Sequence, residues 1–238
     1  MKEALRGKTI IFDGDSICHA TSETQAPERG WAYRIGAANE MDWHNVGISG
    51  ATVTAEMYSR VTGNARHWVS RSIDQIHEDF PHVDFLIIEG GTNDADLISE
   101  YEPEKLGSFD PDDYSGNYDD TTFCGAFESL FFKAINYYPQ TRIGYIVAPK
   151  MCDSSIEVFK NRRHYFEIAM DICRKWGIPY IDLWQNCPIN PRLKVYFDQT
   201  LTGPENAAAG KAYVDGQHLT ATGYDMVSPI IEAWLLTL

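Results

Sequence analysis

The chain has 238 residues, of which 44% are hydrophobic and 23% charged, and its formal net charge at pH 7 is −14. This length and composition fit one globular domain of ordinary size and indicate no linker that would divide it. The acidic balance disfavours nucleic acid and anionic membranes as partners, because binding to phosphate groups needs a basic face.

The sequence also argues against membrane insertion and against a cysteine-based framework. No apolar run approaches the length of a transmembrane helix. The five cysteines are widely spaced and form no C-x-x-C pair, so we expect neither a disulfide framework nor a zinc site. The basic N-terminus has no apolar segment behind it, which predicts that there is no signal peptide and that the protein is cytoplasmic.

Short apolar runs alternate with amphipathic segments along the chain. The predicted strands are 9–12, 42–46, 83–89, 142–147 and 178–183, and the predicted helices are 17–20, 31–40, 64–80, 122–138, 155–176 and 221–236. We expect no regular element in 96–120 or in 186–217. Strands separated by helices predict an α/β fold, a three-layer α/β/α sandwich with a five-stranded parallel sheet, in a single domain 1–238. Ligand chemistry should then gather at the carboxyl ends of the strands.

The first strand ends abruptly in Asp13-Gly14-Asp15-Ser16. We expect Gly14 to adopt a backbone angle that larger residues resist. The turn would leave the hydroxyl of Ser16 at the edge of the sheet and beside a helix N-terminus, where free N–H groups favour developing negative charge. On a simpler interpretation, Asp15 or Ser16 only caps the helix.

Three further turns carry polar groups at the expected sheet edge: Asn45-Val46-Gly47-Ile48-Ser49-Gly50, Gly91-Thr92-Asn93-Asp94 and Asp215-Gly216-Gln217-His218. Together with Gly14-Asp15-Ser16, and in this order, they resemble the four sequence blocks of the SGNH hydrolases, also called GDSL esterases or lipases. Gly-Thr-Asn-Asp is the most specific single block. One departure is Leu219, where many members have Pro after the His. The resemblance implies a flavodoxin-like SGNH hydrolase fold and acyl ester hydrolysis without a metal or other cofactor.

The residues themselves support this chemistry. Acyl transfer by Ser16 needs a base and an acid that orients the base, and His218 and Asp215 lie three residues apart. The Asp215 carboxylate would accept a hydrogen bond from Nδ1–H of His218 and leave Nε2 of the same ring facing Ser16. The backbone N–H groups of Ser16 and Gly50 and the side-chain amide of Asn93 would form the oxyanion hole.

Each assignment has a competing interpretation. Asn93 and Gly50 could be ordinary turn residues, and we expect Asp15 and Asp94 to be structural. The pattern Asp-x-x-His also occurs at Asp74–His77 and at Asp79–His82, where a solvated helix face or a helix end explains it. The segment 110–116 resembles a calcium loop but lacks the Gly and Glu that an EF-hand requires, so we expect no metal site.

The acidic insertion at about 96–120 is the basis of the substrate prediction. It follows the Asn93 turn directly and carries Tyr101, Phe109, Tyr114 and Tyr118 among many acids. Acids would repel anionic substrates, and aromatic rings suit a sugar. We therefore expect a short acyl group, acetyl above all, on a neutral carbohydrate. The alternatives are a lipase- or thioesterase-like acylhydrolase, a non-catalytic carbohydrate-binding module, and an insertion that is only a solvated loop. The oligomeric state is left open.

Overall fold

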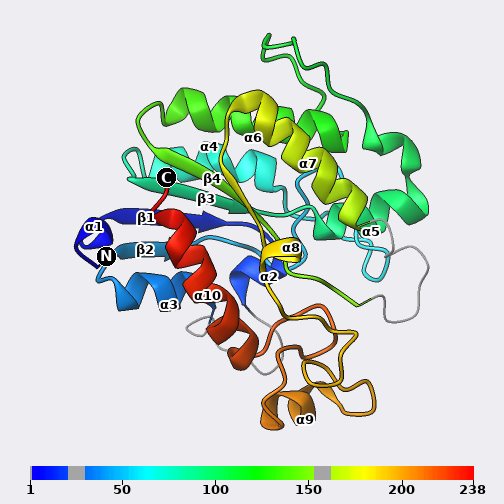
Figure 1. Cartoon of the computed structure of the whole chain (residues 1–238). Helices are drawn as coiled ribbons and strands as arrows, with labels where there is room; N and C mark the ends of the chain where they lie inside the picture. The colour runs from blue at the N-terminus through cyan, green and yellow to red at the C-terminus, as the bar shows by residue number, and fades with distance from the viewer. Residues whose placement is uncertain (1, 21–29, 153–161) are drawn as a thin grey trace.

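The computed structural model describes residues 2–20, 30–152 and 162–238 (Figure 1). Its sheet is parallel and has the order β2-β1-β3-β4-β5. The strands are β1 (Thr9–Asp13), β2 (Asp42–Asn45), β3 (Phe85–Glu89), β4 (Arg142–Val147) and β5 (Tyr180–Asp182). The helices are α1 (Lys2–Leu5), α2 (Ser16–His19), α3 (Trp31–Ala38), α4 (Val69–Asp79), α5 (Thr92–Tyr101), the 3₁₀ helix η2 (Pro103–Leu106), α6 (Phe123–Tyr137), α7 (Arg162–Trp176), α8 (Leu183–Asn186), α9 (Gly203–Ala208) and α10 (Ala221–Leu235).

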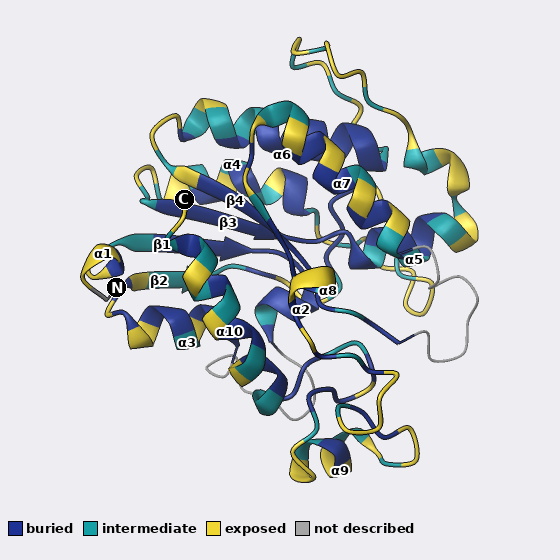
Figure 2. Cartoon of the chain, viewed as in Figure 1, coloured by how far each residue is buried: buried dark blue, intermediate teal, exposed yellow. Residues whose placement is uncertain are grey.

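The sheet lies between two helix layers, as predicted. Figure 1 shows α3 and α10 together on one face and α4, α6 and α7 on the other. All five residues of β3 are buried, and Ile10, Ile11 and Phe12 of β1 are fully covered (Figure 2). These near-continuous apolar strands are typical of a parallel sheet that is covered on both faces. The predicted α/β/α fold is therefore confirmed.

The strand order places two of the predicted site turns side by side. Strands β1 and β3 are neighbours, with Asp13 opposite Ile88. The turn after β1 carries Ser16, and the turn after β3 leads into Asn93 at the start of α5. Their carboxyl ends therefore meet at one edge of the sheet, where open α/β sheets bind ligands.

The structure differs from the prediction in 96–120 and in 186–217. The stretch 96–120 was expected to lack elements, but α5 continues to Tyr101 because Ala95, Leu97 and Ile98 recur at helical spacing and are buried. The region 186–217 contains α9, which begins with a capping box between Thr202 and Glu205. Of the helix predicted at 155–176, residues 155–161 lie outside the described residues.

Residues 110–118 of the acidic insertion pack on the helix layer and away from the candidate site. Tyr114 and Tyr118 make edge contacts with Trp176, the last residue of α7. Lys175 donates a hydrogen bond to the carbonyl of Asp110 (2.7 Å) and forms a buried ion pair with Glu128 (2.8 Å). Because α7 runs antiparallel to the strands, its last turn lies toward the amino ends of the strands, opposite Ser16. The expectation that Tyr114 and Tyr118 recognise a sugar at the site is therefore wrong.

No helix in the described ranges is both long enough and apolar enough to cross a bilayer. All five cysteines are buried and carry free thiols.

Candidate active site

The turn after β1 holds Ser16 at the start of a short helix. A Cβ at Gly14 would stand 2.5 Å from the carbonyl oxygen of Glu89, so this position requires glycine for space. Gly14 does not adopt a positive φ, which corrects the reason predicted for it. Asp15 caps α2, since its Oδ1 accepts a hydrogen bond from the N–H of Ile17 (2.9 Å). Ser16 is the first helical residue, and 6% of it is exposed.

The structure brings Ser16, His218 and Asp215 into one hydrogen-bonded chain. Ser16 Oγ lies 2.9 Å from His218 Nε2, and His218 Nδ1 lies 2.7 Å from Asp215 Oδ2. The other carboxylate oxygen, Oδ1, accepts the backbone N–H groups of Gln217 (2.9 Å) and His218 (2.8 Å). Asp215 therefore holds both the imidazole and the turn that carries it. With Nδ1–H bound to a carboxylate, Nε2 is free to accept the hydroxyl proton of Ser16.

The electrostatic surroundings raise the pKa of His218 above its ordinary value. Burial alone would lower this pKa, but the hydrogen bond and charge of Asp215, together with the charge of Asp15, outweigh it. Burial would likewise raise the pKa of Asp215, yet its hydrogen bonds and its attraction to His218 keep this pKa below the ordinary value. The pair therefore favours an imidazolium next to a carboxylate, which is the state that a general base reaches after it takes a proton.

The residues predicted for an oxyanion hole lie around the same hydroxyl-bearing turn. Gly50 has a φ of +78°, a conformation that favours glycine. Asn93 lies in the first turn of α5, and its Nδ2 donates to the carbonyl of Ala51 (2.8 Å) and, more weakly, to Asp15 Oδ2 (3.4 Å). Donation from Asn93 to an oxyanion would replace the longer of these two bonds. Within the described part of the chain, the N–H groups of Ser16 and Gly50 donate to no other protein group.

Asp94 fixes the loop of Gly50 against α5. Its carboxylate is fully buried and accepts the N–H groups of Val53 (2.9 Å) and Thr54 (2.8 Å). Burial raises the pKa of Asp94 to about 6, and the hydrogen bonds limit the rise. The contacts of Asp15 and Asp94 thus show the structural roles that were expected for them.

Two ionisable groups at the site were not predicted from the sequence. Arg162, at the start of α7, is 1% exposed and binds Asp96 and the side chain of Gln217, which lies between Asp215 and His218. Glu89, at the end of β3, is buried beneath the Ser16 turn and accepts the N–H of Asp15 (3.3 Å). Burial and the charge of Asp15 raise the pKa of Glu89 well above its ordinary value. A buried ionisable side chain whose partner lies far away along the chain produces no periodic pattern by which the sequence would reveal it.

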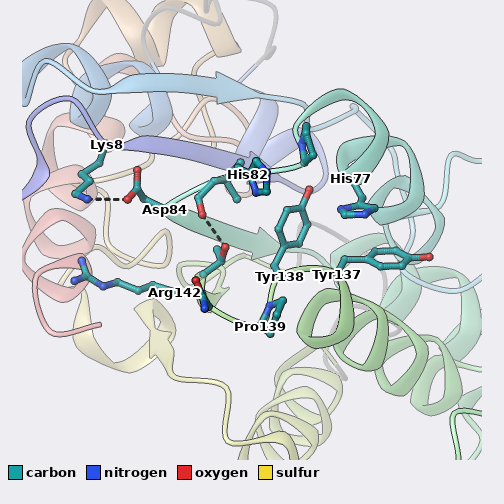
Figure 3. Close-up of a pocket in the computed structure, with 12 residues that line it drawn as sticks. Lys8, His77, His82, Asp84, Tyr137, Tyr138, Pro139 and Arg142 are labelled. Carbon is teal, nitrogen blue, oxygen red and sulfur yellow. Dashed lines mark hydrogen bonds and ion pairs between the residues drawn. The ribbon is translucent and has the colours of Figure 1, made fainter.

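The alternative Asp-x-x-His pairs lie elsewhere. Asp74 binds Lys133 and Tyr137, while the ring of His77 stacks on Tyr137. His77 and His82 line a cavity of about 620 Å³ at the amino ends of the strands, the edge opposite Ser16. Both side chains are labelled in Figure 3. Within the described ranges, no group of three or more His, Cys, Asp or Glu side chains could hold a metal ion.

Comparison with solved structures shows the same fold over nearly the whole chain. A carbohydrate acetylesterase family member from Sinorhizobium meliloti is 15% identical, with 97% of this chain and 100% of that chain covered and a TM-score of 0.59. The aryl esterase of M. smegmatis is 14% identical, with 98% and 100% covered and a TM-score of 0.65. A protein from Lactobacillus plantarum is 18% identical, with 98% of both chains covered and a TM-score of 0.68.

Comparison with curated proteins found no match. The sequence model of the GDSL-like Lipase/Acylhydrolase family matches residues 12–226, which include the Ser16, Gly50, Asn93 and His218 turns. The chain therefore belongs to the GDSL-like lipase/acylhydrolase family and is a hydrolase of the SGNH type.

Proposed function

We propose that the protein is a serine esterase that hydrolyses short-chain acyl esters, acetyl esters above all, through Ser16, His218 and Asp215. The hydrogen-bonded chain from Ser16 Oγ to His218 Nε2 and from His218 Nδ1 to Asp215 carries the proposal. A serine hydroxyl, an imidazole and a carboxylate in this sequence of contacts form the arrangement that nucleophilic acyl transfer requires.

In the first half of the reaction, His218 takes the hydroxyl proton as Ser16 Oγ attacks the ester carbonyl. The carbonyl oxygen becomes an oxyanion that accepts hydrogen bonds from the N–H groups of Ser16 and Gly50 and from Asn93 Nδ2. The C–O bond to the alcohol then breaks, and the alcohol leaves with the proton from His218.

In the second half, a water molecule attacks the acyl-Ser16 ester while His218 takes its proton. The tetrahedral intermediate collapses, the carboxylic acid is released and the proton returns to Ser16 Oγ. Asp215 remains ionised throughout and keeps the imidazole oriented. The proton transfers between Ser16 and His218 use the 2.9 Å contact between Oγ and Nε2.

For the alcohol part of the ester we propose a carbohydrate. The name of the Sinorhizobium meliloti neighbour, a carbohydrate acetylesterase family member, supports this class. A lipase- or thioesterase-like activity is the competing proposal, and the preferred acyl length separates the two. A non-catalytic carbohydrate-binding module would not need the complete Ser16, His218 and Asp215 chain.

The test is hydrolysis of p-nitrophenyl acetate, butyrate and octanoate, followed by acetylated oligosaccharides and an acyl-CoA. We expect kcat/KM to be highest for acetate and to fall with acyl length. Ser16→Ala should lose several orders of magnitude in kcat while staying folded, and the exposed Ser49, changed to Ala, serves as the control. Full activity of Ser16→Ala would contradict the mechanism, and a preference for octanoate or acyl-CoA would contradict the substrate class.

A further inference from the structure

Arg66 is a half-buried cation at the border of the proposed oxyanion hole. Its Nη1 donates a 2.7 Å hydrogen bond to the carbonyl oxygen of Gly50, whose N–H is one of the proposed oxyanion donors. A Cβ at Gly50 would come within 2.8 Å of the same nitrogen. The guanidinium therefore lies directly against the turn that would hold the substrate carbonyl.

Within the described residues, Arg66 has no carboxylate partner. Other arginines of the same half-buried or buried class, such as Arg162 and Arg163, form ion pairs. The Nε–H of Arg66 is enclosed by protein atoms and has no acceptor there. A buried donor without a partner costs free energy. The chain has 34 acidic residues, and none of the described ones accepts this hydrogen bond.

Arg66 lies at one end of a groove of about 590 Å³ between β2 and α4. Ile48, Trp68, Ile76 and Phe80 give this groove apolar walls. It also adjoins the Ser16 turn, because the N–H of Ile48 donates to the carbonyl of Gly14 (2.8 Å). We call this cavity the Arg66 groove.

The charges in the Arg66 groove are separated along its length. Arg66 and Arg71 lie at the end next to Gly50. Glu78 and Asp79 lie at the other end, roughly 12 Å farther along α4, where salt screens much of their effect. Asp74 is held by Lys133 and Tyr137. The end of the groove next to the proposed oxyanion hole is thus electropositive.

Asp96, whose carboxylate lies near enough to Arg66 to feel its charge, is already paired. Burial raises the pKa of Asp96, and the charges of Arg162 and Arg66 act against that rise. Asp96, however, makes two 2.7 Å hydrogen bonds to Arg162. Residues 110–118 of the acidic insertion, which was expected to repel anions from the site, pack on α6 and α7 instead.

We propose that the Arg66 groove binds the alcohol part of the ester and that Arg66 recognises a negatively charged group on a ring held there. The inference rests on the proposed esterase function and narrows its substrate class to esters of ring alcohols that carry an anion. The apolar walls contact the ring, and the guanidinium donates charge-assisted hydrogen bonds to the anion. A sugar acid and an aryl acid both have this chemistry.

Matched pairs of esters test the proposal. The acetyl esters of 3- and 4-hydroxybenzoate are compared with the same compounds as methyl esters, which transfer the same acetyl group and lack only the charge. An acetylated uronic acid and its methyl ester repeat the comparison on a sugar ring. The series with the larger effect of charge shows whether a sugar acid or an aryl acid fits the Arg66 groove. We expect the charged member of a pair to have the higher kcat/KM.

Arg66→Met should lower kcat/KM about 10- to 100-fold for the charged esters, mainly through KM, and less than about 3-fold for the neutral ones. Arg66→Lys, which keeps the charge but loses the planar fork, should lie between. Arg142→Met is the matched control, since Arg142 also has no ion pair within the described residues but lies over Phe85 at the opposite edge of the sheet. This control should leave the preference for the charged esters unchanged.

Equal losses of kcat/KM on charged and neutral esters in Arg66→Met would overturn the inference. The remaining role of Arg66 would then be to support the Gly50 turn. A binding measurement is independent of turnover. In the Ser16→Ala background, calorimetry should detect 4-hydroxybenzoate binding that Arg66→Met weakens about 10-fold or more, and unchanged binding would overturn the inference. Failure of the proposed function gives a different result, because hydrolysis of every ester would then be absent or independent of Ser16.

Discussion

Arg162 and Asp96 face each other in a two-pronged ion pair, with Nε and Nη2 each 2.7 Å from a carboxylate oxygen. The same Nη2 donates to Gln217 Oε1 (2.9 Å), so the pair joins α7 and α5 to the turn of Asp215 and His218. Because the guanidinium is 1% exposed, this contact fixes a turn that is otherwise half open to solvent.

The first prediction follows from this ion pair. Asp96→Asn leaves the charge of Arg162 less compensated, and that charge lowers the pKa of His218. The acidic limb of the kcat/KM profile should therefore move to lower pH, and kcat should fall about 10-fold as the turn loosens. Asp171→Asn, in an exposed pair with Arg174, is the control. A profile that shifts to higher pH in Asp96→Asn would show that Arg162 does not act on His218.

The second prediction concerns Asn93. As a donor to the oxyanion it acts mainly in the transition state, so Asn93→Ala should lower kcat by about 10²- to 10³-fold with little change in KM. Steady-state kinetics on p-nitrophenyl acetate measures both constants. If KM rises strongly while kcat is kept, Asn93 binds the substrate in its ground state instead.

The third prediction concerns pH and Asp215. A base must be unprotonated to act, and the pKa of His218 is raised, so the rate should fall as pH drops through a value above the ordinary histidine pKa of about 6.5. Asp215→Asn removes the hydrogen bond and the charge that raise this pKa most, so the pKa of His218 should fall. The residual activity, reduced about 10³- to 10⁴-fold, should then persist to lower pH than in the wild type. An unchanged acidic limb in Asp215→Asn would exclude the Asp215–His218 contact as its cause.

The fourth prediction concerns stability and Asp13. This side chain is 2% exposed and is hydrogen-bonded to Ser72, and burial raises its pKa from 3.8 to about 7. The folded state therefore holds the proton more tightly than the unfolded state. The free-energy cost of ionising Asp13 in the folded state is absent below about pH 4 and reaches its full size above about pH 7.

Asp13→Asn cannot ionise, so it avoids this cost. The free energy of unfolding of Asp13→Asn relative to wild type should rise between pH 4 and pH 8. The rise should be on the order of a few kcal/mol, as the pKa shift of Asp13 implies. Urea titrations at several pH values measure it. A relative stability that falls or stays flat over this range would contradict the buried, protonated state of Asp13.

The sheet and most helices could be predicted because their residues follow simple periodic patterns. In β3, residues 85–88 are apolar and Gly90-Gly91 follow the strand, and the strand predicted at 142–147 has the observed bounds of β4. Helix α5 was missed because acids surround its buried positions and hide the helical period. Helix α9 carried a readable signal, since Thr202 and Glu205 form a capping box with Pro204 between them.

The site could be predicted in part for a different reason. Ser16, Asn93 and His218 stand in turns whose order along the chain is informative, and the structure brings them together. Arg66 and Arg162 were missed because their roles depend on Gly50 and Asp96, contacts that arise only on folding. Tyr114 and Tyr118 of the acidic insertion misled the prediction, because composition does not show that both contact Trp176.

The central claim is that Ser16 is a nucleophile activated by His218, and labelling with a fluorophosphonate tests it most directly. Intact-mass and peptide mass spectrometry should find one adduct, on Ser16, in the wild type, in the Ser49→Ala control and in His77→Ala. Ser16→Ala should take up no label, and His218→Ala should be labelled slower by orders of magnitude. An adduct on another residue, or undiminished labelling of folded Ser16→Ala, would contradict the account.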